Sequence, residues 1–265
     1  MNMKQTIQKV RRILLLLCMV LGSYVQTIAQ PDPVITARAH YENGNYSEAL
    51  KLYLQTSESR FSGEDYVLIG NMYYNGWGTT RNYSKAVGYY RKADWQFKDK
   101  YAQYYLGMMY MEGKGVDQNS KVAESKLYDA ASQGIKDAWY ELGMMYFQGK
   151  AGVRVWHERA GQYFTEGAKV FHLKCMNMLD DYPDLDVRRK EVEIMVYEPD
   201  GTKCIGGVVK FEKAKNKYGT VTDHYGKARI KAKYGDKLQV SFIGCKTQSL
   251  NIGDSKSYVV RLKKN

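Results

Sequence analysis

Cysteine and histidine are scarce, with four of each among 265 residues. No two cysteines have the C-x-x-C spacing of a zinc or redox motif, and His157-Glu158 lacks the second histidine of a zinc-binding helix. The sequence also lacks a G-x-S-x-G motif, a phosphate-binding loop and a paired-carboxylate signature. We therefore expect no catalytic site, no metal and no cofactor.

Long apolar runs are also missing, apart from one of nine residues at 13–21 (ILLLLCMVL). A permanent membrane-spanning helix needs about 20 apolar residues. The run follows a basic segment and precedes small residues that end at Ala29, an order typical of a secretory signal peptide. We expect residues 1–29 to be this signal and the mature chain to be exported to the periplasm or cell surface, without a transmembrane helix. Lipidation of Cys18 is disfavoured because Leu17, not a small residue, precedes it.

Loss of the signal would leave three cysteines, Cys175, Cys204 and Cys245. An odd number permits at most one internal pair, and Cys204 with Cys245 is the plausible pair because both lie in the last third. An exported compartment would allow this disulfide to form. The alternative is that the thiols are small buried apolar side chains. The sequence leaves both possibilities open.

Basic residues exceed acidic ones by 12, but the excess is uneven. Residues 31–187 have 18 basic and 20 acidic side chains, whereas residues 188–265 have 18 and 8. This split indicates two domains of different character. We expect no nucleic-acid partner, since no recognised nucleic-acid motif accompanies the basic residues.

The chain contains an internal repeat of 36–37 residues. Three stretches align, beginning at Tyr66, Tyr101 and Asp137, and the letters LGMMY occur in the second and third. The positions that match are small or aromatic: Gly70, Gly107, Gly143, Tyr73, Tyr110, Tyr146, Gly76, Gly113, Gly149, Ala86, Ala123 and Ala160. A period of this length is typical of a stacked helical solenoid.

Each unit predicts a pair of helices. The first helix should end at Gly76, Gly113 or Gly149, where glycine can adopt the left-handed cap conformation. The second should begin shortly afterwards, with Asn82 and Asn119 as N-caps. Glycine inside a helix costs about 1 kcal/mol relative to alanine. Its recurrence inside the first helix therefore predicts close approach of the paired helix, where alanines also recur.

The ends of the helical region depart from the repeat. Residues 37–55 fit a variant of the unit, with Ala49 and Tyr53 in its second helix, and residues 170–179 predict a closing helix. Atypical ends are expected because a single unit cannot bury its apolar face alone. We assign residues 30–180 to an α-α helical repeat solenoid.

The pattern A-x-x-x-L-G-x-x-Y-x-x-G-x-G-V, followed by K-x-A and A-A-x-x-G, resembles the Sel-one-like repeat, a relative of the tetratricopeptide repeat. The third unit departs at Gly167, and the first departs at Ile69 and Thr79. Proteins with these repeats mostly act as interaction scaffolds, so the resemblance implies the fold and only a broad function. The second unit matches at Leu106, Gly107, Tyr110, Gly113, Gly115, Val116, Ala123, Ala130, Ala131 and Gly134.

The two methionines of each LGMMY should lie on different faces, because residues i, i+4 and i+7 share one side of a helix. Met109 and Met145 are expected to pack. By analogy with tetratricopeptide-type units, the other stripe would line a groove for an apolar peptide or helix, which flexible methionines suit. The candidate partner-binding residues are Asn71, Tyr74, Tyr104, Met108, Met111, Tyr140, Met144 and Phe147.

The alternative is that these side chains pack between neighbouring units. A copper site is disfavoured because no histidine or cysteine lies near the methionines in the motif. The groove and the packing interpretation both remain open at the level of sequence.

Residues 191–265 change to an alternation of charged and apolar residues, which is strand patterning. Turn signals separate about seven short runs, which predicts a small antiparallel β-sandwich. Residues 181–190 should link the two domains; their acidic cluster DDYPDLD lacks the glycine turn and terminal glutamate of a calcium loop. The basic side chains mostly point outward, so they form a solvated face or contact an anionic envelope surface or acidic partner.

The stretch 219–252 resembles the carboxypeptidase regulatory-like domain, a transthyretin-like sandwich. Ala228 and Cys245 depart from the family, which usually has larger side chains there. The resemblance implies a docking module without a peptidase site, of a kind common in exported proteins of Bacteroidota-like bacteria. It rests on Thr220, Thr222, Asp223, Gly226, Ile230, Gly235, Leu238, Ser241, Phe242 and Gly244.

These observations favour two hypotheses for function. In the first, the chain is a non-enzymatic adaptor of the cell envelope, in which the repeats bind a protein or peptide and the sandwich docks. In the second, it is an envelope module that binds glycan or peptidoglycan.

Overall fold

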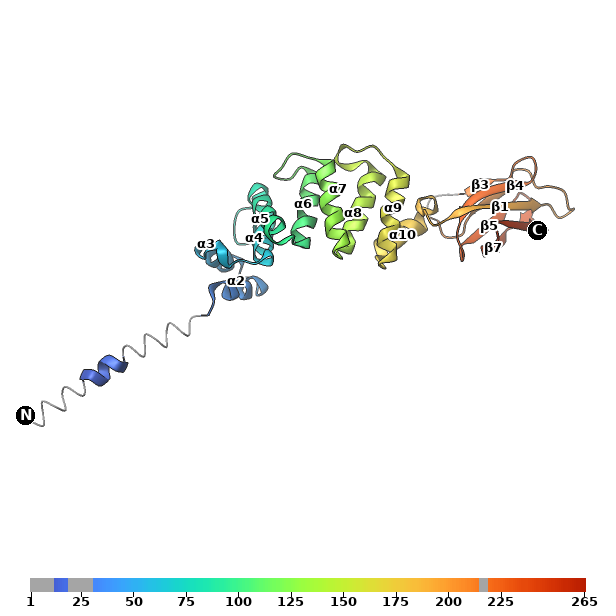
Figure 1. The fold of residues 1–265 in the computed structure, drawn as a ribbon. Coiled ribbons are helices and arrows are strands. Elements are labelled where there is room, and N and C mark those ends of the chain that lie inside the picture. Colours follow the sequence, from blue (N-terminus) through green and yellow to red (C-terminus); the bar gives the residue numbers. More distant parts are fainter. Residues whose placement is uncertain (1–11, 19–30, 215–218) are drawn as a thin grey trace, which may run out of the picture. The chain divides into compact units, whose positions relative to one another are not determined.

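The computed structural model describes residues 12–18, 31–214 and 219–265 (Figure 1). The predicted signal peptide, residues 1–29, lies outside these residues except for 12–18, which are helical and exposed. No helix in the described part of the chain combines the length and the apolar character that a membrane span requires. The chain divides into two compact units, Met1–Tyr89 and Tyr90–Asn265, and each is described by itself.

The first unit contains the N-terminal helices. Buried side chains of α2 and α3 include Ala37, Ala49 and Tyr53, as expected for a variant of the repeat unit. The elements are α2 (Pro33–Glu42), α3 (Tyr46–Gln55), the short 3-10 helix η1 (Glu58–Arg60), α4 (Gly63–Asn75) and the first half of α5 (Tyr83–Phe97).

A buried carboxylate joins three elements of this unit. Asp65 on α4 is fully buried and accepts hydrogen bonds from Arg38 Nε of α2 at 2.6 Å and from the Tyr53 hydroxyl of α3 at 3.0 Å. Asp65 also forms a capping box with Ser62 at the start of α4. Burial opposes ionisation, but the bonds from Arg38 and Ser62 outweigh it and lower the pKa of Asp65.

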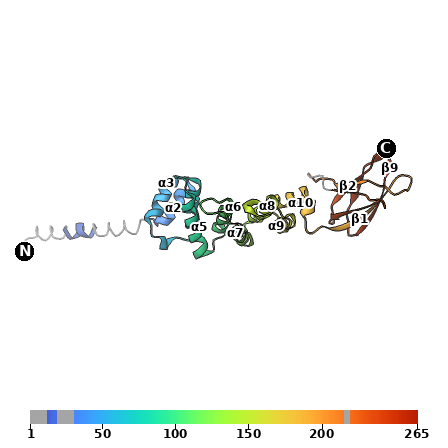
Figure 2. The same cartoon turned by 90° about the horizontal axis from the view of Figure 1, so that it is seen from above.

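The helices of the second unit form two rows. Figure 2 shows α6, α8 and α10 in one row, with α7 and α9 in the other. Their shared core includes Leu127, Leu142 and Phe164, which are fully buried. The elements are α6 (Lys100–Glu112), α7 (Ser120–Ser132), α8 (Lys136–Gln148), η2 (Lys150–Gly152), α9 (His157–Lys169), α10 (Leu173–Asp181) and η3 (Pro183–Leu185).

The predicted helix ends are confirmed. Gly113 and Gly149 follow α6 and α8 in the left-handed conformation, both with φ of 70°. The Asn119 side chain caps α7 by accepting a hydrogen bond from the Val122 backbone N–H at 3.1 Å. In the first unit Gly76 ends α4 in the same way. The turn chemistry of the sequence therefore sets where each helix stops and starts.

The two glycines inside α6 and α8 permit close packing, as predicted. A Cβ atom on Gly107 would lie 2.7 Å from Cγ of Leu127, and one on Gly143 would lie 2.3 Å from Cε1 of Phe164. The nearest neighbours are thus large side chains of the paired helices, not the recurrent alanines that the sequence suggested. The lost helix propensity of glycine is offset because a bulky core residue fills the space above it.

The C-terminal region consists of β-sheets, and the predicted fold class, helical repeats followed by a β-sandwich, is confirmed. The sheets have the strand orders β4-β1-β8, β3-β2-β5-β7 and β6-β9. The strands are β1 (Lys190–Tyr197), β2 (Val208–Phe211), β3 (Gly219–Val221), β4 (Lys227–Ala232), β5 (Lys237–Ser241), β6 (Cys245–Lys246), β7 (Gln248–Asn251), β8 (Ser257–Arg261) and β9 (Lys263–Lys264).

One strand pair differs from the antiparallel pattern expected. β1 pairs with β4 in antiparallel register, but with β8 in parallel register. A parallel pair requires a long connection between its strands, and here nearly the whole sandwich lies between β1 and β8. Period-two alternation identifies a strand but does not reveal the direction of its neighbour.

The two cysteines of the sandwich are free thiols in this structure. Cys204 is fully buried in the core with Ile194 and Val240, and Cys245 is half-buried against the same core. The structure therefore agrees with the second possibility, in which these cysteines are small apolar side chains and do not form a disulfide. Basic side chains of β4 point outward, where Lys227 forms an ion pair of 2.9 Å with Glu193, which agrees with a solvated face.

Residues 181–190, the predicted linker, include the last residue of α10, η3 and the first residue of β1. Arg189 is buried within this segment and donates to the carbonyl oxygens of Leu179 at 3.2 Å and Pro183 at 3.1 Å. Its other nitrogens donate to Asp236 of the sandwich at 2.9 and 3.2 Å. One guanidinium group thus connects the end of the solenoid to the β4–β5 turn.

Candidate functional site

The structure places four methionines of α6 and α8 in the interior. Met109 and Met145 are fully buried, which confirms their predicted packing role. Met111 and Met144, which were placed in the candidate groove, are only 3% and 9% exposed. Met111 and Met144 therefore pack between neighbouring units, as the alternative interpretation proposed, and offer little surface to a partner.

The aromatic residues of the predicted stripe are half-buried and contact their own chain. Tyr140 lies 6.0 Å from the Phe164 ring, centroid to centroid, and carries Lys174 Nζ of α10 5.4 Å above its own ring. Phe147 makes an edge contact with Tyr182 at 5.0 Å. Tyr104 and Met108 on α6 likewise pack against the shared core. This stripe faces the next helices of the solenoid because those helices need an apolar surface to stack upon.

The two candidates in the first unit have intramolecular contacts of their own. Asn71 is half-buried and its amide nitrogen lies 3.5 Å from the Tyr41 hydroxyl. Tyr74 is half-buried and makes an edge contact with the Tyr83 ring at 5.2 Å. Both residues retain some accessible surface.

The accessible surface of α6 and α8 coincides only in part with the predicted stripe. On α6 it includes Tyr101, which is 50% exposed, with the half-buried Tyr105 and Met108. On α8 it includes the half-buried Tyr140 and Glu141. We call these five residues the first-helix face, because α6 and α8 are the first helices of their units and lie in the same row (Figure 2).

Glu141 is the only charged member of the first-helix face, and its carboxylate has no hydrogen bond or ion pair among the described residues. Burial raises the pKa of Glu141; Lys150 and Lys174 partly oppose this increase, and Asp137 and Glu112 add to it. These neighbours belong to α6, α8, η2 and α10.

A second half-buried glutamate has the opposite environment. Glu124 of α7 accepts hydrogen bonds from the Tyr146 hydroxyl at 2.8 Å, from Arg159 Nη2 at 2.5 Å and from the Tyr163 hydroxyl. Burial disfavours its charge, but the donors Tyr163, Arg159 and Tyr146 outweigh burial and lower the pKa of Glu124. The guanidinium of Arg159 also lies over the Tyr146 ring at 5.1 Å. This network joins α7, α8 and α9.

The arrangement most similar to a catalytic nucleophile is Cys175 with His172 and Asp137. His172 Nδ1 lies 3.2 Å from the Cys175 sulfur, and its Nε2 lies 3.2 Å from Asp137 Oδ1. Cys175 is fully buried, however, and its sulfur would lie 2.3 Å from a Cβ on Gly167. Burial, and then Asp137, raise the pKa of the Cys175 thiol to about 12. A reactive cysteine needs an accessible, stabilised thiolate, so this thiol packs and does not attack.

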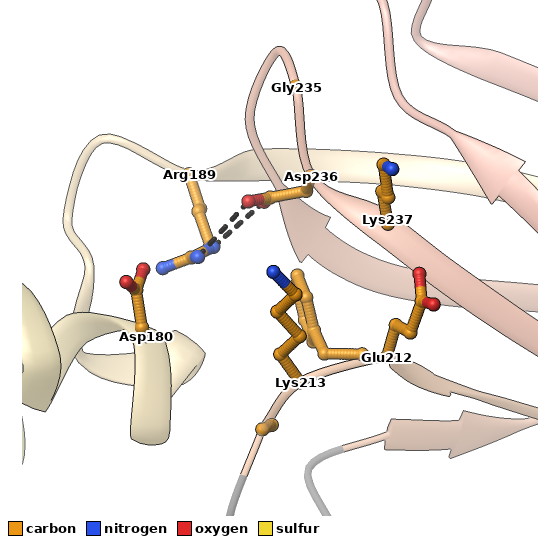
Figure 3. Close-up of a pocket in the computed structure, with 9 residues that line it drawn as sticks. Asp180, Arg189, Glu212, Lys213, Gly235, Asp236 and Lys237 are labelled. Atoms are coloured by element: carbon orange, nitrogen blue, oxygen red, sulfur yellow. Dashed lines mark hydrogen bonds and ion pairs between the residues drawn. The ribbon is translucent and has the colours of Figure 1, made fainter.

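A cavity of about 240 Å³ lies beside the joint between α10 and the sandwich. In Figure 3 the Arg189 guanidinium meets Asp236 at one side, while Lys213 and Glu212 come from the opposite side. Positive and negative groups alternate around the space, and Arg189 is held by Asp236 and two carbonyl oxygens. The lining therefore favours neither an anion nor a cation. Within the described ranges, no three His, Cys, Asp or Glu side chains are placed to hold a metal ion.

Two features escaped the prediction from sequence. Glu141 follows Tyr140, a residue of the predicted stripe, by one position. A stripe that started at Tyr101 would have included Tyr105 at i+4, and Tyr105 is equivalent to Glu141 in the next repeat. Arg189 follows the acidic cluster at the domain boundary, but a single arginine in a polar segment has no pattern that signals burial.

Three stretches of the chain match the Sel1 repeat family: residues 66–93, 100–124 and 137–169. These begin at or within one residue of the three predicted units. The helices within these three stretches therefore match the Sel1 repeat. The pair α2 and α3 is not among the matched residues.

Several solved structures are similar to parts of the chain. A Sel1 repeat protein from Oxalobacter formigenes is 25% identical with a TM-score of 0.49, over 58% of this chain and 61% of that one. A protective antigen of uropathogenic Escherichia coli with an SLR fold is 24% identical with a TM-score of 0.48, over 55% and 32%. The C-terminal domain of the PapC usher is 21% identical with a TM-score of 0.22, over 28% and 98%. The matched part thus spans less than two thirds of either repeat protein.

Proposed function

We propose that this protein is a non-enzymatic interaction scaffold of the cell envelope that binds a protein partner on the first-helix face. Sel1 repeats are generally protein–protein interaction modules. The observation that carries the proposal is the set of Tyr101, Tyr105 and Met108 on one side of α6, which remain accessible although Leu106, Gly107 and Met109 are buried.

The composition of this surface supports a protein partner. Tyrosine offers a large contact area and a polar hydroxyl at a small entropic cost, and methionine adapts its shape to a partner. Tyr105 stacks on Tyr90 at 5.1 Å, so its ring is already held in place before a partner arrives. Preorganised aromatic side chains of this kind are typical of residues that dominate binding energy.

The cellular setting is part of the same proposal. The signal-like start of the sequence supports export, and the resemblance of residues 219–252 to an envelope docking module supports a location at the periplasm or cell surface. In this setting the repeats bind the partner and the sandwich attaches to another envelope component. The outward basic side chains of the sandwich suit an anionic surface.

Site-specific crosslinking in the native cell tests the proposal. A photoreactive residue at Tyr101 or Tyr105 should crosslink to one protein, whereas the same residue at Tyr234, which is 74% exposed on the sandwich, should not. The purified partner should then bind the Tyr101→Ala/Met108→Ala variant about tenfold more weakly than the wild type. Equal affinity for a folded variant, or crosslinks to glycan alone, would contradict a protein-binding role for this face.

A further inference from the structure

We propose that one end of the sandwich docks on an anionic lipid bilayer, with Ile243 entering the interface and the lysines of the β6–β9 pair facing the lipid headgroups. The inference rests on the proposed function and names the envelope component to which the sandwich attaches. We call Ile243, Lys246, Lys263 and Lys264 the docking tip.

The docking tip lies at the end of the sandwich away from α10. β1 starts at Lys190, beside the buried Arg189 of the joint, and runs to Tyr197. The Leu262 backbone N–H donates to the Tyr197 carbonyl oxygen at 2.9 Å, so the residues that follow Leu262 lie beyond that end of β1. There β6 and β9 pair as a short antiparallel ribbon. The tip is thus separated from the joint by the length of β1.

The first observation is the exposure of Ile243. This side chain is 93% exposed, more than any other large apolar side chain among the described residues. The Cys245 N–H donates to the Phe242 carbonyl oxygen at 3.1 Å and closes a tight turn, in which Gly244 has a φ of 79°. This geometry is typical of a type II turn, which places Ile243 at the outer corner. Phe242 packs against the core and anchors the turn, so Ile243 is held outward.

The second observation is the charge of the ribbon that follows this turn. Lys246 of β6 lies directly opposite Lys263 of β9, and Lys264 lies opposite Cys245. Like charges on directly opposed residues of a β-ladder are destabilising. Neither Lys246 nor Lys263 has an ion pair among the described residues, and Asp200 acts on Lys264 only at longer range. The fold therefore keeps a local repulsion that an external anion would relieve.

The third observation is that the apolar and the charged part of the tip fit one surface. A free anion would be held by the lysines but would gain nothing from Ile243. The boundary between headgroups and acyl chains of a bilayer offers phosphates and an apolar phase together. The basic excess also extends over the whole domain, since residues 188–265 have 18 basic and 8 acidic side chains. A charge spread in this way is attracted to an extended anionic surface, which favours a bilayer.

Vesicle sedimentation of the mature chain, residues 30–265, as export would leave it, tests this inference. The chain should bind vesicles of phosphatidylethanolamine and phosphatidylglycerol in equal parts about tenfold more tightly than vesicles in which phosphatidylcholine replaces the phosphatidylglycerol. Added salt should weaken the binding to the anionic vesicles. Ile243→Ser should lower the affinity for these vesicles about tenfold, and Lys246→Gln/Lys263→Gln should do the same. The lysine variant should unfold no more easily than the wild type, because it removes the repulsion in the ribbon.

Two variants at the joint end of the same domain are matched controls. Tyr234→Ser removes another exposed apolar side chain from a turn, and Lys213→Gln/Lys237→Gln removes the same charge as the lysine variant of the tip. Each control should lower the affinity by less than about twofold. An equal loss in the control pair of lysines would show that total charge determines the binding, and would overturn the assignment of the docking tip.

The outcomes also separate this inference from the proposed function. Equal affinity for the two vesicle types, or unchanged affinity of a folded Ile243→Ser variant, would overturn the inference, and crosslinks from Tyr101 to one protein would still support the proposed function. A photoreactive residue at position 243 that crosslinks to a protein in the native cell would also overturn the inference, in favour of a protein at the tip. Vesicle binding as expected, without a protein crosslink from Tyr101, would support the tip and contradict a protein-binding role for the first-helix face.

Discussion

Glu124 on α7 and Glu141 on α8 lie on adjacent helices of the second compact unit, Tyr90–Asn265. Both side chains are half-buried, yet their surroundings are opposite. Glu124 accepts hydrogen bonds from Tyr146, Arg159 and Tyr163, and these donors lower its pKa. Glu141 has no such donor, and burial raises its pKa. The difference indicates that Glu124 joins three helices of the solenoid, whereas Glu141 makes no such connection among the described residues.

This comparison illustrates how a repeat protein can divide its two helix rows. The Glu124 network connects α7 and α9 of one row to α8 of the other. The first helices then present their accessible side chains outward. A charge that stabilises the fold needs internal partners, because a buried charge without one is strongly destabilising.

Removal of the Glu124 carboxylate should produce the largest loss of stability. Glu124→Ala would leave Arg159 and two tyrosyl hydroxyls without their acceptor, so the free energy of unfolding should fall by about 2–3 kcal/mol. The estimate is below the range for a fully buried pair because the Arg159 side chain is 34% exposed. Chemical denaturation measures the change. Glu141→Ala is the control and should change the stability by less than about 0.5 kcal/mol; equal losses would contradict the contrast between the two residues.

Displacement of α8 from α9 should have the next largest effect. Gly143→Ala places a Cβ within 2.3 Å of the Phe164 ring. Overpacking of this kind costs about 1–3 kcal/mol, of which about 1 kcal/mol is recovered as helix propensity. The environments of Glu124 and Glu141 depend on the packing of α8 against α9, so thermal unfolding should show a net loss of stability. Gly88→Ala in α5 is the control, since its Cβ would meet nothing within 4 Å. If Gly143→Ala is as stable as Gly88→Ala, the packing described is wrong.

Loss of a single donor should have a smaller effect. Tyr163→Phe removes one hydrogen bond to Glu124 while keeping the ring, and should reduce the free energy of unfolding by about 1 kcal/mol. Tyr140→Phe is the comparison, because the Tyr140 hydroxyl has no hydrogen bond among the described residues. Its stability should match that of the wild type. A larger effect of Tyr140→Phe than of Tyr163→Phe would reverse the roles of the two networks.

The smallest predicted effect is on the pH dependence of stability. Glu124 and Glu141 should change the stability in opposite directions as the pH rises. The lowered pKa of Glu124 contributes stability above the ordinary glutamate value, and this stability is lost as the pH falls through that value to the folded one. The raised pKa of Glu141 has the opposite effect, and stability decreases as the pH rises from the ordinary value through the folded one. Glu141→Gln should therefore equal the wild type in acid and exceed it slightly at neutral pH. A variant less stable than the wild type at neutral pH would show that Glu141 supports the fold.

Much of the helical region could be predicted from sequence, because its signals are local. Gly113, Gly149 and Asn119 determine helix ends through their own backbone and side-chain preferences. The choice of accessible stripe could not be predicted in the same way. Met111 and Met144 have the spacing of a surface stripe, but the neighbouring helices cover them, and that packing depends on residues a whole repeat away.

The sandwich and the joint show the same limit. Alternation revealed the strands, yet the parallel pairing of β1 with β8 depends on contacts between the two ends of the domain. Arg189 occupies a segment that composition alone makes a linker. Its burial depends on Asp236 and on two carbonyl oxygens of α10 and η3, which come together only in the folded chain.

A carboxyl NMR titration of the full chain tests the contrast between Glu124 and Glu141 most directly, with the two signals assigned by Glu124→Gln and Glu141→Gln. The pKa of Glu124 should lie below the ordinary glutamate value and that of Glu141 above it. An ordinary or lowered pKa for Glu141, or a raised pKa for Glu124, would contradict the contrast between the two residues.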